Sequence, residues 1–221
     1  VHRGFDVTLV EMADQVLATL DKDMAVVVED HLGRHGVRVA LNDGVAAFEQ
    51  GDEGSLNVRT KSGKVYPADV VILALGVRPD TDLARAAGLQ IGERGGIRVD
   101  DQMRTSHADI FAVGDAVEVK DVLTGEASLV ALAGPANRQG RIAADVIAGQ
   151  PSRFRGTQGT AIIGLFGGAA AWTGIGEKTL AKRGDDDYEK VYLFPNAHAG
   201  YYPGAKPIAL KFLFRKSDGR V

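Results

Sequence analysis

Two short stretches carry acidic residues at positions where a carboxylate could accept a hydrogen bond from a bound ligand. Glu11 ends the β-forming run Val7–Val10, and an acid at such a strand end accepts hydrogen bonds from ribose hydroxyls in nucleotide-binding sheets. Gly114-Asp115 follows a second apolar run, where the glycine admits a close ligand and the carboxylate can accept a hydrogen bond from a sugar-like hydroxyl. Plainer interpretations stay open: an exposed strand-end acid for Glu11, and a turn aspartate that caps local amides for Asp115.

Gly134-Pro135 marks a helix start, because proline is favoured where its missing N–H is not needed. The free N–H groups and positive dipole end of such a start stabilise negative charge, by about 0.3–1 kcal/mol when exposed. An ordinary helix start is the alternative. The histidines show no metal-ligand spacing, so we expect no metal site, and we expect His2, His31, His35 and His107 to lie at the surface.

Composition narrows the class of protein. The 221 residues carry 26 Lys and Arg against 29 Asp and Glu, a net charge of −3, which argues against a nucleic-acid partner. No apolar run in the sequence is long enough to span a membrane, and we expect no signal peptide. The absence of cysteine excludes a thiolate nucleophile in this chain and fits a reducing, cytoplasmic compartment.

Elements that position these residues follow from hydrophobic periodicity. A strand at 7–10, a helix after residue 21 with Met24, Val27, Val28 and Leu32 on one face, and a strand at 37–39 predict a parallel pair with a helical crossover. Alternating runs and turns predict an antiparallel meander of strands at 45–50, 55–60 and 65–67. The continuous apolar runs Val70–Leu75 and Ile110–Val113 predict strands buried on both faces.

The remaining pattern completes an α/β fold. Helices are expected at 81–87 and from Gly134 to Gly149, with a polar boundary at 150–158. Strand-like runs follow at 160–165, 190–194 and 208–214.

Five stretches together resemble one family, the FAD-dependent pyridine nucleotide-disulfide oxidoreductases, in the branch of coenzyme A-disulfide reductases and NADH oxidases. They are Leu73-Ala74-Leu75-Gly76-Val77-Arg78-Pro79, Ile110-Phe111-Ala112-Val113-Gly114-Asp115, Leu132-Ala133-Gly134-Pro135-Ala136-Asn137-Arg138-Gln139-Gly140-Arg141, Gly156-Thr157-Gln158-Gly159-Thr160 and His198-Ala199-Gly200-Tyr201-Tyr202-Pro203-Gly204-Ala205. Any one of them is a weak signal, whereas the ordered set is specific.

The resemblance implies a fold and a domain order. We expect partial doubly wound, Rossmann-like FAD- and NAD(P)-binding domains with an antiparallel β-meander, followed by the start of an α+β dimerisation domain. Residues 1–75 resemble the later part of the NAD(H) domain with its return strand, 76–150 the second half of the FAD domain, and 157–221 the N-terminal part of the dimerisation domain. The family's glycine-rich loops and redox cysteine would precede Val1, so we expect an interior portion truncated at both ends.

The resemblance also implies site residues. FAD is expected at Gly114, Asp115, Leu132, Ala133, Gly134 and Pro135, and NAD at Glu11 and Gly76. Tyr201 and Tyr202 are expected to reach the active site of a partner subunit, either as catalytic groups or as interface packing. Glu11 would repel a 2′-phosphate, and no Arg or Lys lies between it and Lys22, which favours NADH over NADPH.

The function implied for the intact protein is electron transfer from NADH through flavin to a disulfide such as coenzyme A disulfide, by a homodimer. Alternatives within the enzyme class are an NADH oxidase and a persulfide or polysulfide reductase. The alternative of another class is a non-catalytic structural or dimerisation remnant. This portion alone is expected to be inactive, because disulfide exchange requires a thiolate and the chain has no cysteine.

Overall fold

The computed structural model describes residue 1 and residues 3–221, apart from the side chain of Glu53, and the expectation for His2 lies outside them. The chain forms two compact units. The first contains Val1–Leu73, Gly164–Ala170 and Ile175–Val221, and the second contains Ala74–Ile163 and Ala171–Gly174. No helix in the described residues is long and apolar enough to cross a membrane.

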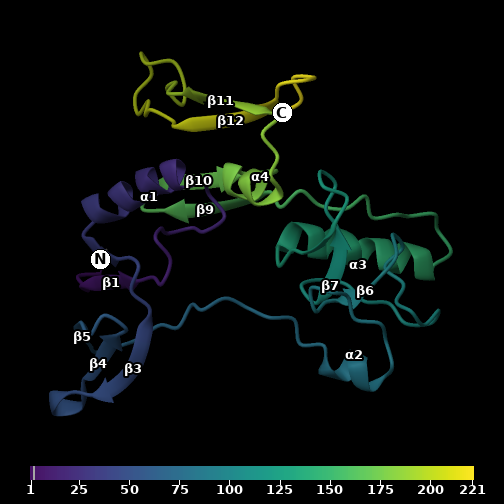
Figure 1. Ribbon diagram of the computed structural model, residues 1–221, viewed down its shortest axis with the longest axis horizontal. Coiled ribbons are helices and arrows are strands. Elements are labelled where there is room, and N and C mark those ends of the chain that lie inside the picture. The colour runs from purple at the N-terminus through teal and green to yellow at the C-terminus, as the bar shows by residue number, and fades with distance from the viewer. Residues whose placement is uncertain (2) are drawn as a thin grey trace. The chain divides into compact units, whose positions relative to one another are not determined.

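Single helices separate groups of strands along the chain (Figure 1). The helices are α1 (Lys22–Arg34), α2 (Asp82–Ala86), α3 (Ala133–Ile147), α4 (Glu177–Arg183) and the 3₁₀ turn Asp52–Gly54. The strands are β1 (Val7–Val10), β2 (Val37–Ala40), β3 (Val45–Gln50), β4 (Leu56–Thr60), β5 (Val65–Ala68), β6 (Ile97–Arg98), β7 (Val117–Lys120), β8 (Ala127–Leu129), β9 (Ala161–Leu165), β10 (Gly168–Trp172), β11 (Tyr188–Leu193) and β12 (Leu210–Arg215).

The first unit begins with the predicted parallel crossover. β1 pairs with β2 in parallel, and α1 connects them. A small core forms there because Val28 and Leu32 of α1 pack with Val16 and Val37. Val27, predicted on the same helix face, is exposed instead, because the buried stripe runs through Ala25, Val28 and Leu32. The predicted meander is confirmed, with β3–β4 and β4–β5 both antiparallel.

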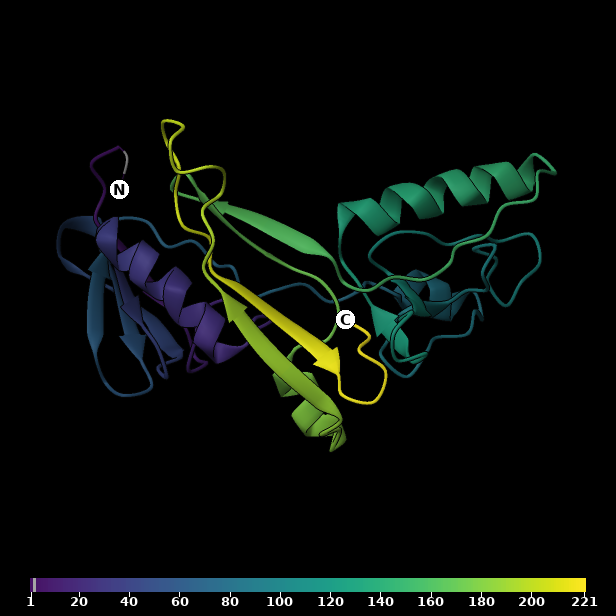
Figure 2. The same ribbon diagram turned by 90° about the horizontal axis from the view of Figure 1, so that it is seen from above.

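The C-terminal part of the first unit contains α4 and the antiparallel pair β11–β12, whose two strands lie side by side in Figure 2.

Two of the four histidines expected at the surface, both at the end of α1, are half-buried. His31 Nε2 lies 3.0 Å from the carbonyl oxygen of Leu165, and the His35 ring stacks on Phe166 at 4.8 Å between ring centroids. That prediction was wrong for His31 and His35, because the turn between β9 and β10 covers this end of α1.

The second unit contains the sheet β6–β7–β8, in which β6 and β7 are parallel and β7 and β8 antiparallel. Its core gathers Met103, Val117, Val119, Ala143 and Phe154. Ala143 brings α3 into that core, so the helix is anchored on the sheet through one face.

Two predicted strands are absent from the described structure. Val70–Leu75 and Ile110–Val113 form no strand, apart from an isolated bridge between Arg104 and Phe111. Ile72 and Leu75 are each 86% exposed. The prediction of burial on both faces was wrong, because it needs a neighbouring strand on each side and no described strand pairs with either run.

Candidate functional site

The Gly114-Asp115 turn in the second unit is held by one buried side chain. Gly114 has a φ of +87°, which favours glycine, and its backbone N–H donates to Oε1 of Gln139 at 2.7 Å. Asp115 is exposed, and its carboxylate has no hydrogen-bond or ion-pair partner among the described residues. The plainer interpretation, an aspartate that caps local amides, is therefore not supported, and the carboxylate is available to a ligand.

Helix α3 is bonded to this turn through Gln139. The helix begins at Ala133, one residue before the predicted start, after the extended residue Leu132, and no side-chain hydrogen bond caps it in the described chain. Ala133 and Gly134 are exposed. Gln139 follows Gly134 by five residues, about 7.5 Å along the helix axis at 1.5 Å per residue. The bond from Gly114 to Gln139 therefore links the Gly114-Asp115 turn to the middle of α3.

These residues fit a flavin dinucleotide. A free carboxylate accepts a hydrogen bond from a polyol hydroxyl, and an uncapped helix start stabilises an electron-rich ring edge. A Cβ added to Gly114 or to Gly134 would meet no atom within 4 Å, so the space above both is open. Of the sequence-predicted FAD residues, Gly114 and Asp115 share one turn, and Leu132, Ala133, Gly134 and Pro135 form the start of α3. The described contact between the two groups runs from Gly114 to Gln139 of the same helix.

Gln139 was not singled out from the sequence, although a signal for it existed. The buried residues of α3 are Pro135, Gln139, Ala143 and Val146, a stripe at helical spacing in which Gln139 is the polar member. Because buried polar groups are nearly always hydrogen-bonded, a glutamine within an apolar stripe points to a specific partner.

Glu11 lies where the sequence predicts, at the end of β1. Its backbone N–H donates to the carbonyl oxygen of Ala40 at 2.8 Å, and its Oε1 accepts the N–H of Ala13 at 2.8 Å. One carboxylate oxygen thus caps the following loop, while Oε2 has no partner in the described part of the chain. Gly76, predicted beside it at the NAD site, belongs to the second unit and is exposed with a φ of +85°.

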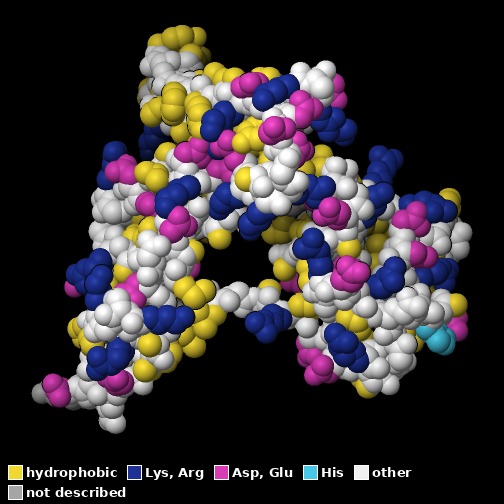
Figure 3. All heavy atoms as spheres, in the orientation of Figure 1, with side chains coloured by type: hydrophobic (Ala, Val, Ile, Leu, Met, Phe, Trp, Pro, Cys, Tyr) yellow, Lys and Arg dark blue, Asp and Glu magenta, His cyan; other side chains and the backbone are white. Residues whose placement is uncertain are grey.

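Tyr201 and Tyr202 lie in the loop between β11 and β12. They are 85% and 60% exposed, with ring centroids 5.1 Å apart, and the ring of His198 lies 6.3 Å from that of Tyr202. Apolar side chains are visible at this loop, at the top of Figure 3. Both hydroxyls are without a hydrogen-bond partner within residues 1 and 3–221, so no described residue fixes them.

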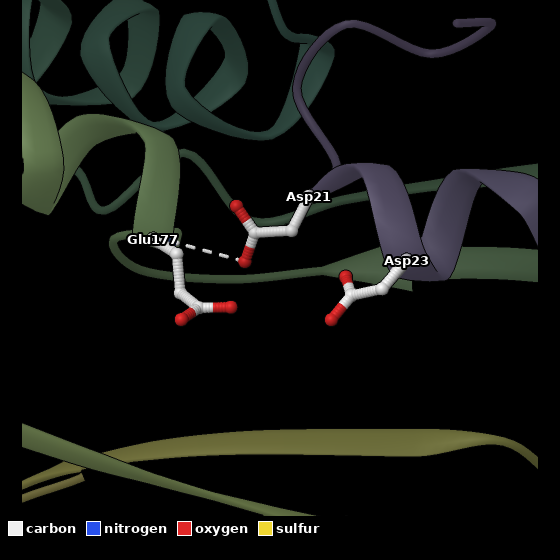
Figure 4. A group of neighbouring side chains, drawn as sticks. All are labelled: Asp21, Asp23 and Glu177. Carbon is white, nitrogen blue, oxygen red and sulfur yellow. Dashed lines mark hydrogen bonds between the residues drawn. The ribbon is translucent and has the colours of Figure 1, made fainter.

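A charged cluster that the sequence did not reveal lies in the first unit. Carboxylate oxygens of Asp21, Asp23 and Glu177 lie within 4.8 Å of one another (Figure 4). The ammonium of Lys211, only 5% exposed, lies 3.0 Å from Asp21 and 2.8 Å from Asp23 and also contacts Glu177. Because this ammonium supplies the positive charge at the cluster, we interpret the group as an ion-pair network.

Titration follows from that geometry. Burial opposes ionisation of Glu177, but hydrogen bonds from Lys211, Lys190 and Tyr188 outweigh it and lower its pKa. Burial likewise opposes ionisation of Asp23, and hydrogen bonds from Lys211 and Tyr192 lower its pKa. Burial disfavours the charged form of Lys211, yet its three carboxylate partners raise its pKa. All three groups are therefore charged at neutral pH.

The family follows from comparison with known proteins. The model of the pyridine nucleotide-disulphide oxidoreductase family matches residues 2–140, more than half of the chain. The chain belongs to this family.

Individual relatives agree with that class. The chain is 36% identical, over its whole length and 49% of the relative, to the CoA-dependent NAD(P)H sulfur oxidoreductase of Pyrococcus furiosus. It is 30% identical to the coenzyme A disulfide reductase of Staphylococcus aureus strain JH9, over all of this chain and 49% of that protein. The structure of an NAD-dependent persulfide reductase from A. fulgidus matches 96% of this chain and 39% of that one, with a TM-score of 0.90 and 40% identity. The chain spans about half the length of the curated relatives that it matches.

Proposed function

We propose that the protein to which this chain belongs is a FAD-dependent oxidoreductase that passes electrons from NADH through the flavin to a disulfide such as coenzyme A disulfide. The observation that carries the proposal is the bond through Gln139 between α3, whose start is uncapped, and the turn that bears the free carboxylate of Asp115. Family membership and the name of the Staphylococcus aureus relative support the substrate class.

Each residue of the site has a distinct part in holding FAD. Asp115 accepts a hydrogen bond from a ribityl hydroxyl, and Gly114 keeps the backbone clear of it. The segment Leu132, Ala133, Gly134 and Pro135 presents its amides and positive dipole end to the electron-rich N1 edge of the ring. When bound, FAD supplies the two-electron redox chemistry, and the protein orients it and tunes its charge.

The proposed electron donor is NADH. Oε2 of Glu11 accepts a hydrogen bond from an adenosine ribose hydroxyl, while Oε1 is held by Ala13. That bond fixes the carboxylate, and a fixed negative charge repels the 2′-phosphate of NADPH. Gly76 is proposed as an NAD-binding residue on the family resemblance alone.

The domain order is part of the proposal. Residues 1–75 belong to an NAD(H)-binding domain, 76–150 to the second half of a FAD-binding domain, and 157–221 to the start of a dimerisation domain. The exposed runs Val70–Leu75 and Ile110–Val113 are proposed to pair with strands of the longer protein. Their composition supports this, because such apolar runs are typical of strands buried on both faces.

The proposed assembly is a homodimer in the cytoplasm, where NADH is available. Tyr201 and Tyr202 would then lie against the partner's disulfide site. Their exposure and free hydroxyls support this part, because tyrosine suits places where a ring is buried and a hydroxyl finds a partner.

A second candidate acceptor is a persulfide or polysulfide, or O₂ as in an NADH oxidase. The names of the A. fulgidus persulfide reductase and the Pyrococcus furiosus sulfur oxidoreductase favour the sulfur acceptors. These reactions would share the FAD and NADH sites and differ in the final acceptor.

The test uses the complete protein. We expect it to be yellow as purified, to contain about one FAD per chain, and to oxidise NADH when coenzyme A disulfide is added. Persulfide and O₂ are offered separately under the same conditions. A colourless protein that takes up no FAD would contradict the proposal, and faster turnover with persulfide or O₂ would reassign the acceptor.

A further inference from the structure

Gln139 is the most deeply buried polar side chain of the second unit that contacts the candidate site. It is 1% exposed, and its Oε1 accepts the N–H of Gly114 at 2.7 Å. The two residues are 25 positions apart, so the bond joins the middle of α3 to the turn that carries Asp115.

That bond constrains the backbone at a specific place. Gly114 has a φ of +87°, a conformation that most residues avoid, and its flexibility would let the peptide plane before Asp115 rotate. The N–H of Gly114 donates to Gln139 and not to a backbone carbonyl, so no strand or helix ladder holds it. Two bonds therefore orient this turn: the Gly114 carbonyl oxygen accepts the N–H of Val117 at 3.3 Å, and Gln139 is the side chain that holds the Gly114 N–H.

Because Asp115 is bonded directly to Gly114, the same constraint directs its carboxylate. The carboxylate is exposed and has no protein partner among the described residues, so its position depends on the backbone of the turn and on its own side-chain torsions. Gln139 also lies about 7.5 Å along α3 from Gly134, so its bond to Gly114 ties the turn to the helix that carries the uncapped start.

We propose that Gln139 is a positioning residue for FAD: it holds the Gly114 amide so that Asp115 and the start of α3 meet the cofactor at a fixed spacing. This inference rests on the proposed FAD site and adds to it the residue that arranges it. Pre-organised groups bind a ligand more tightly, because the ordering is complete before binding.

A purely structural role makes a different prediction. Gln139 shares its helix face with Ala143 and Val146, which are buried, so any disruptive substitution there lowers stability. Val146→Ala provides the matched control, since it removes buried volume from the same face without touching Gly114. A structural role predicts similar FAD loss in both variants when their stabilities are equal.

The experiment measures FAD binding by the complete protein after the flavin has been removed and titrated back, together with thermal stability of the flavin-free form. Gln139→Met keeps the length of the side chain and removes the acceptor. We expect its Kd for FAD to rise about tenfold, as for loss of one hydrogen bond that leaves a donor unsatisfied. Val146→Ala is expected to lower the melting temperature and to keep the wild-type Kd.

Two further variants keep the inference falsifiable if Gln139→Met does not fold. Gln139→Asn retracts the amide by one methylene and should weaken FAD binding, whereas Gln139→Glu retains an acceptor oxygen and should bind FAD nearly as tightly as wild type. In an Asp115→Ala background, Gln139→Asn should add little further loss, because it acts through Asp115. Wild-type FAD affinity in a folded Met or Asn variant, or full additivity with Asp115→Ala, would overturn the inference. If wild type itself binds no FAD, the proposed function fails instead.

Discussion

The carboxylate of Asp21 caps a helix that begins more than 150 residues later in the chain. It accepts the backbone N–H groups of Glu177 at 3.0 Å and Lys178 at 3.2 Å, at the start of α4. Asp21 also stands at the N-cap of α1, but its side chain does not cap that helix. A Cβ on Gly176 would lie 2.8 Å from Oδ1 of Asp21, so the close approach requires glycine there.

Asp21, which provides this cap, is also one of the carboxylates paired with Lys211. The first prediction concerns the removal of Lys211. Lys211→Met removes the cation that three neighbouring carboxylates share, although Lys190 stays beside Glu177, so we expect the free energy of unfolding to fall by about 3 kcal/mol. Chemical denaturation followed by far-UV circular dichroism measures it. Lys206→Met removes an exposed lysine from the loop before β12 and should change stability by less than about 0.5 kcal/mol. Equal effects of the two substitutions would show that the network contributes nothing.

The network also predicts a pH dependence. The lowered pKa values of Asp23 and Glu177 mean that their contribution is complete above their unfolded values, 3.8 and 4.5, and is lost as pH falls through the lower folded values. Lys211, with a raised pKa, contributes fully below its unfolded value of about 10.4 and loses its contribution only at higher pH. The difference between wild type and Lys211→Met should therefore be constant from about pH 5 to pH 10 and shrink in acid.

The second prediction concerns the exposed run Val70–Leu75. Contiguous exposed apolar side chains of β-forming type favour association between chains. We expect the 221-residue chain, expressed alone, to be poorly soluble, and Ile72→Lys with Leu75→Lys to increase the soluble fraction several-fold. Substituting two exposed polar residues of the meander, Lys61 and Lys64, with arginine is the control. Sedimentation velocity would contradict the prediction if the unsubstituted chain ran as a monomer.

This run also shows where prediction from the sequence stops. The crossover β1–α1–β2 and the β3–β4–β5 meander were predictable, because each element finds its partners within a few tens of residues. Val70–Leu75 has the composition of an interior strand, but composition does not report whether a strand lies on either side. For the same reason a periodicity argument placed Val27 on the buried face of α1, whereas the packing of Val16 and Val37 selects Val28 and Leu32.

The candidate site also has features that the sequence predicts and features that it does not. Gly114, Asp115 and the start of α3 were predictable, since each carries a local signature in the chain. The bond between Gly114 and Gln139, and the cap that Asp21 provides for α4, join segments 25 and more than 150 residues apart. Such pairs depend on how elements pack, which no local pattern records. Of these residues, only Gln139 had a signal in the sequence, because it is a polar residue in the buried stripe of a helix.

The third prediction tests the flavin carboxylate. Asp115→Ala in the complete protein should leave little FAD bound after gel filtration, because it removes an acceptor whose partner would be a ribityl hydroxyl. Asp109→Ala removes another exposed carboxylate of the same unit and should leave FAD content unchanged. Flavin absorbance relative to protein absorbance gives the occupancy. Full occupancy in Asp115→Ala would rule out this assignment.

The fourth prediction concerns the choice of pyridine nucleotide. Glu11 carries a carboxylate fixed by Ala13, and its like-charge repulsion of a 2′-phosphate should make kcat/KM higher for NADH than for NADPH. Glu11→Gln should reduce that preference by about tenfold, which corresponds to about 1.4 kcal/mol. Asp6→Asn, which neutralises the exposed acid before β1, should not alter it. A wild-type preference for NADPH would reverse the prediction.

The last prediction separates two roles for the exposed tyrosines. In a homodimer, a hydroxyl of Tyr201 or Tyr202 could donate a proton to the leaving thiol at the partner's site, or the rings could only fill the interface. A catalytic hydroxyl predicts that Tyr201→Phe or Tyr202→Phe lowers kcat by about tenfold or more, within the usual reach of acid–base groups, while the dimer persists in sedimentation.

Packing makes the opposite prediction for the same variants, because phenylalanine retains the ring area and only alanine removes it. Tyr201→Ala and Tyr202→Ala would then weaken the dimer, and the Phe variants would match wild type. Tyr66→Phe is a control for removal of a hydroxyl elsewhere, since Tyr66 lies in β5. The ring contact of 5.1 Å between Tyr201 and Tyr202 holds in either case, so the hydroxyls alone distinguish the two roles. If both Phe variants turn over disulfide at the wild-type rate, the catalytic role is excluded and the loop serves the interface.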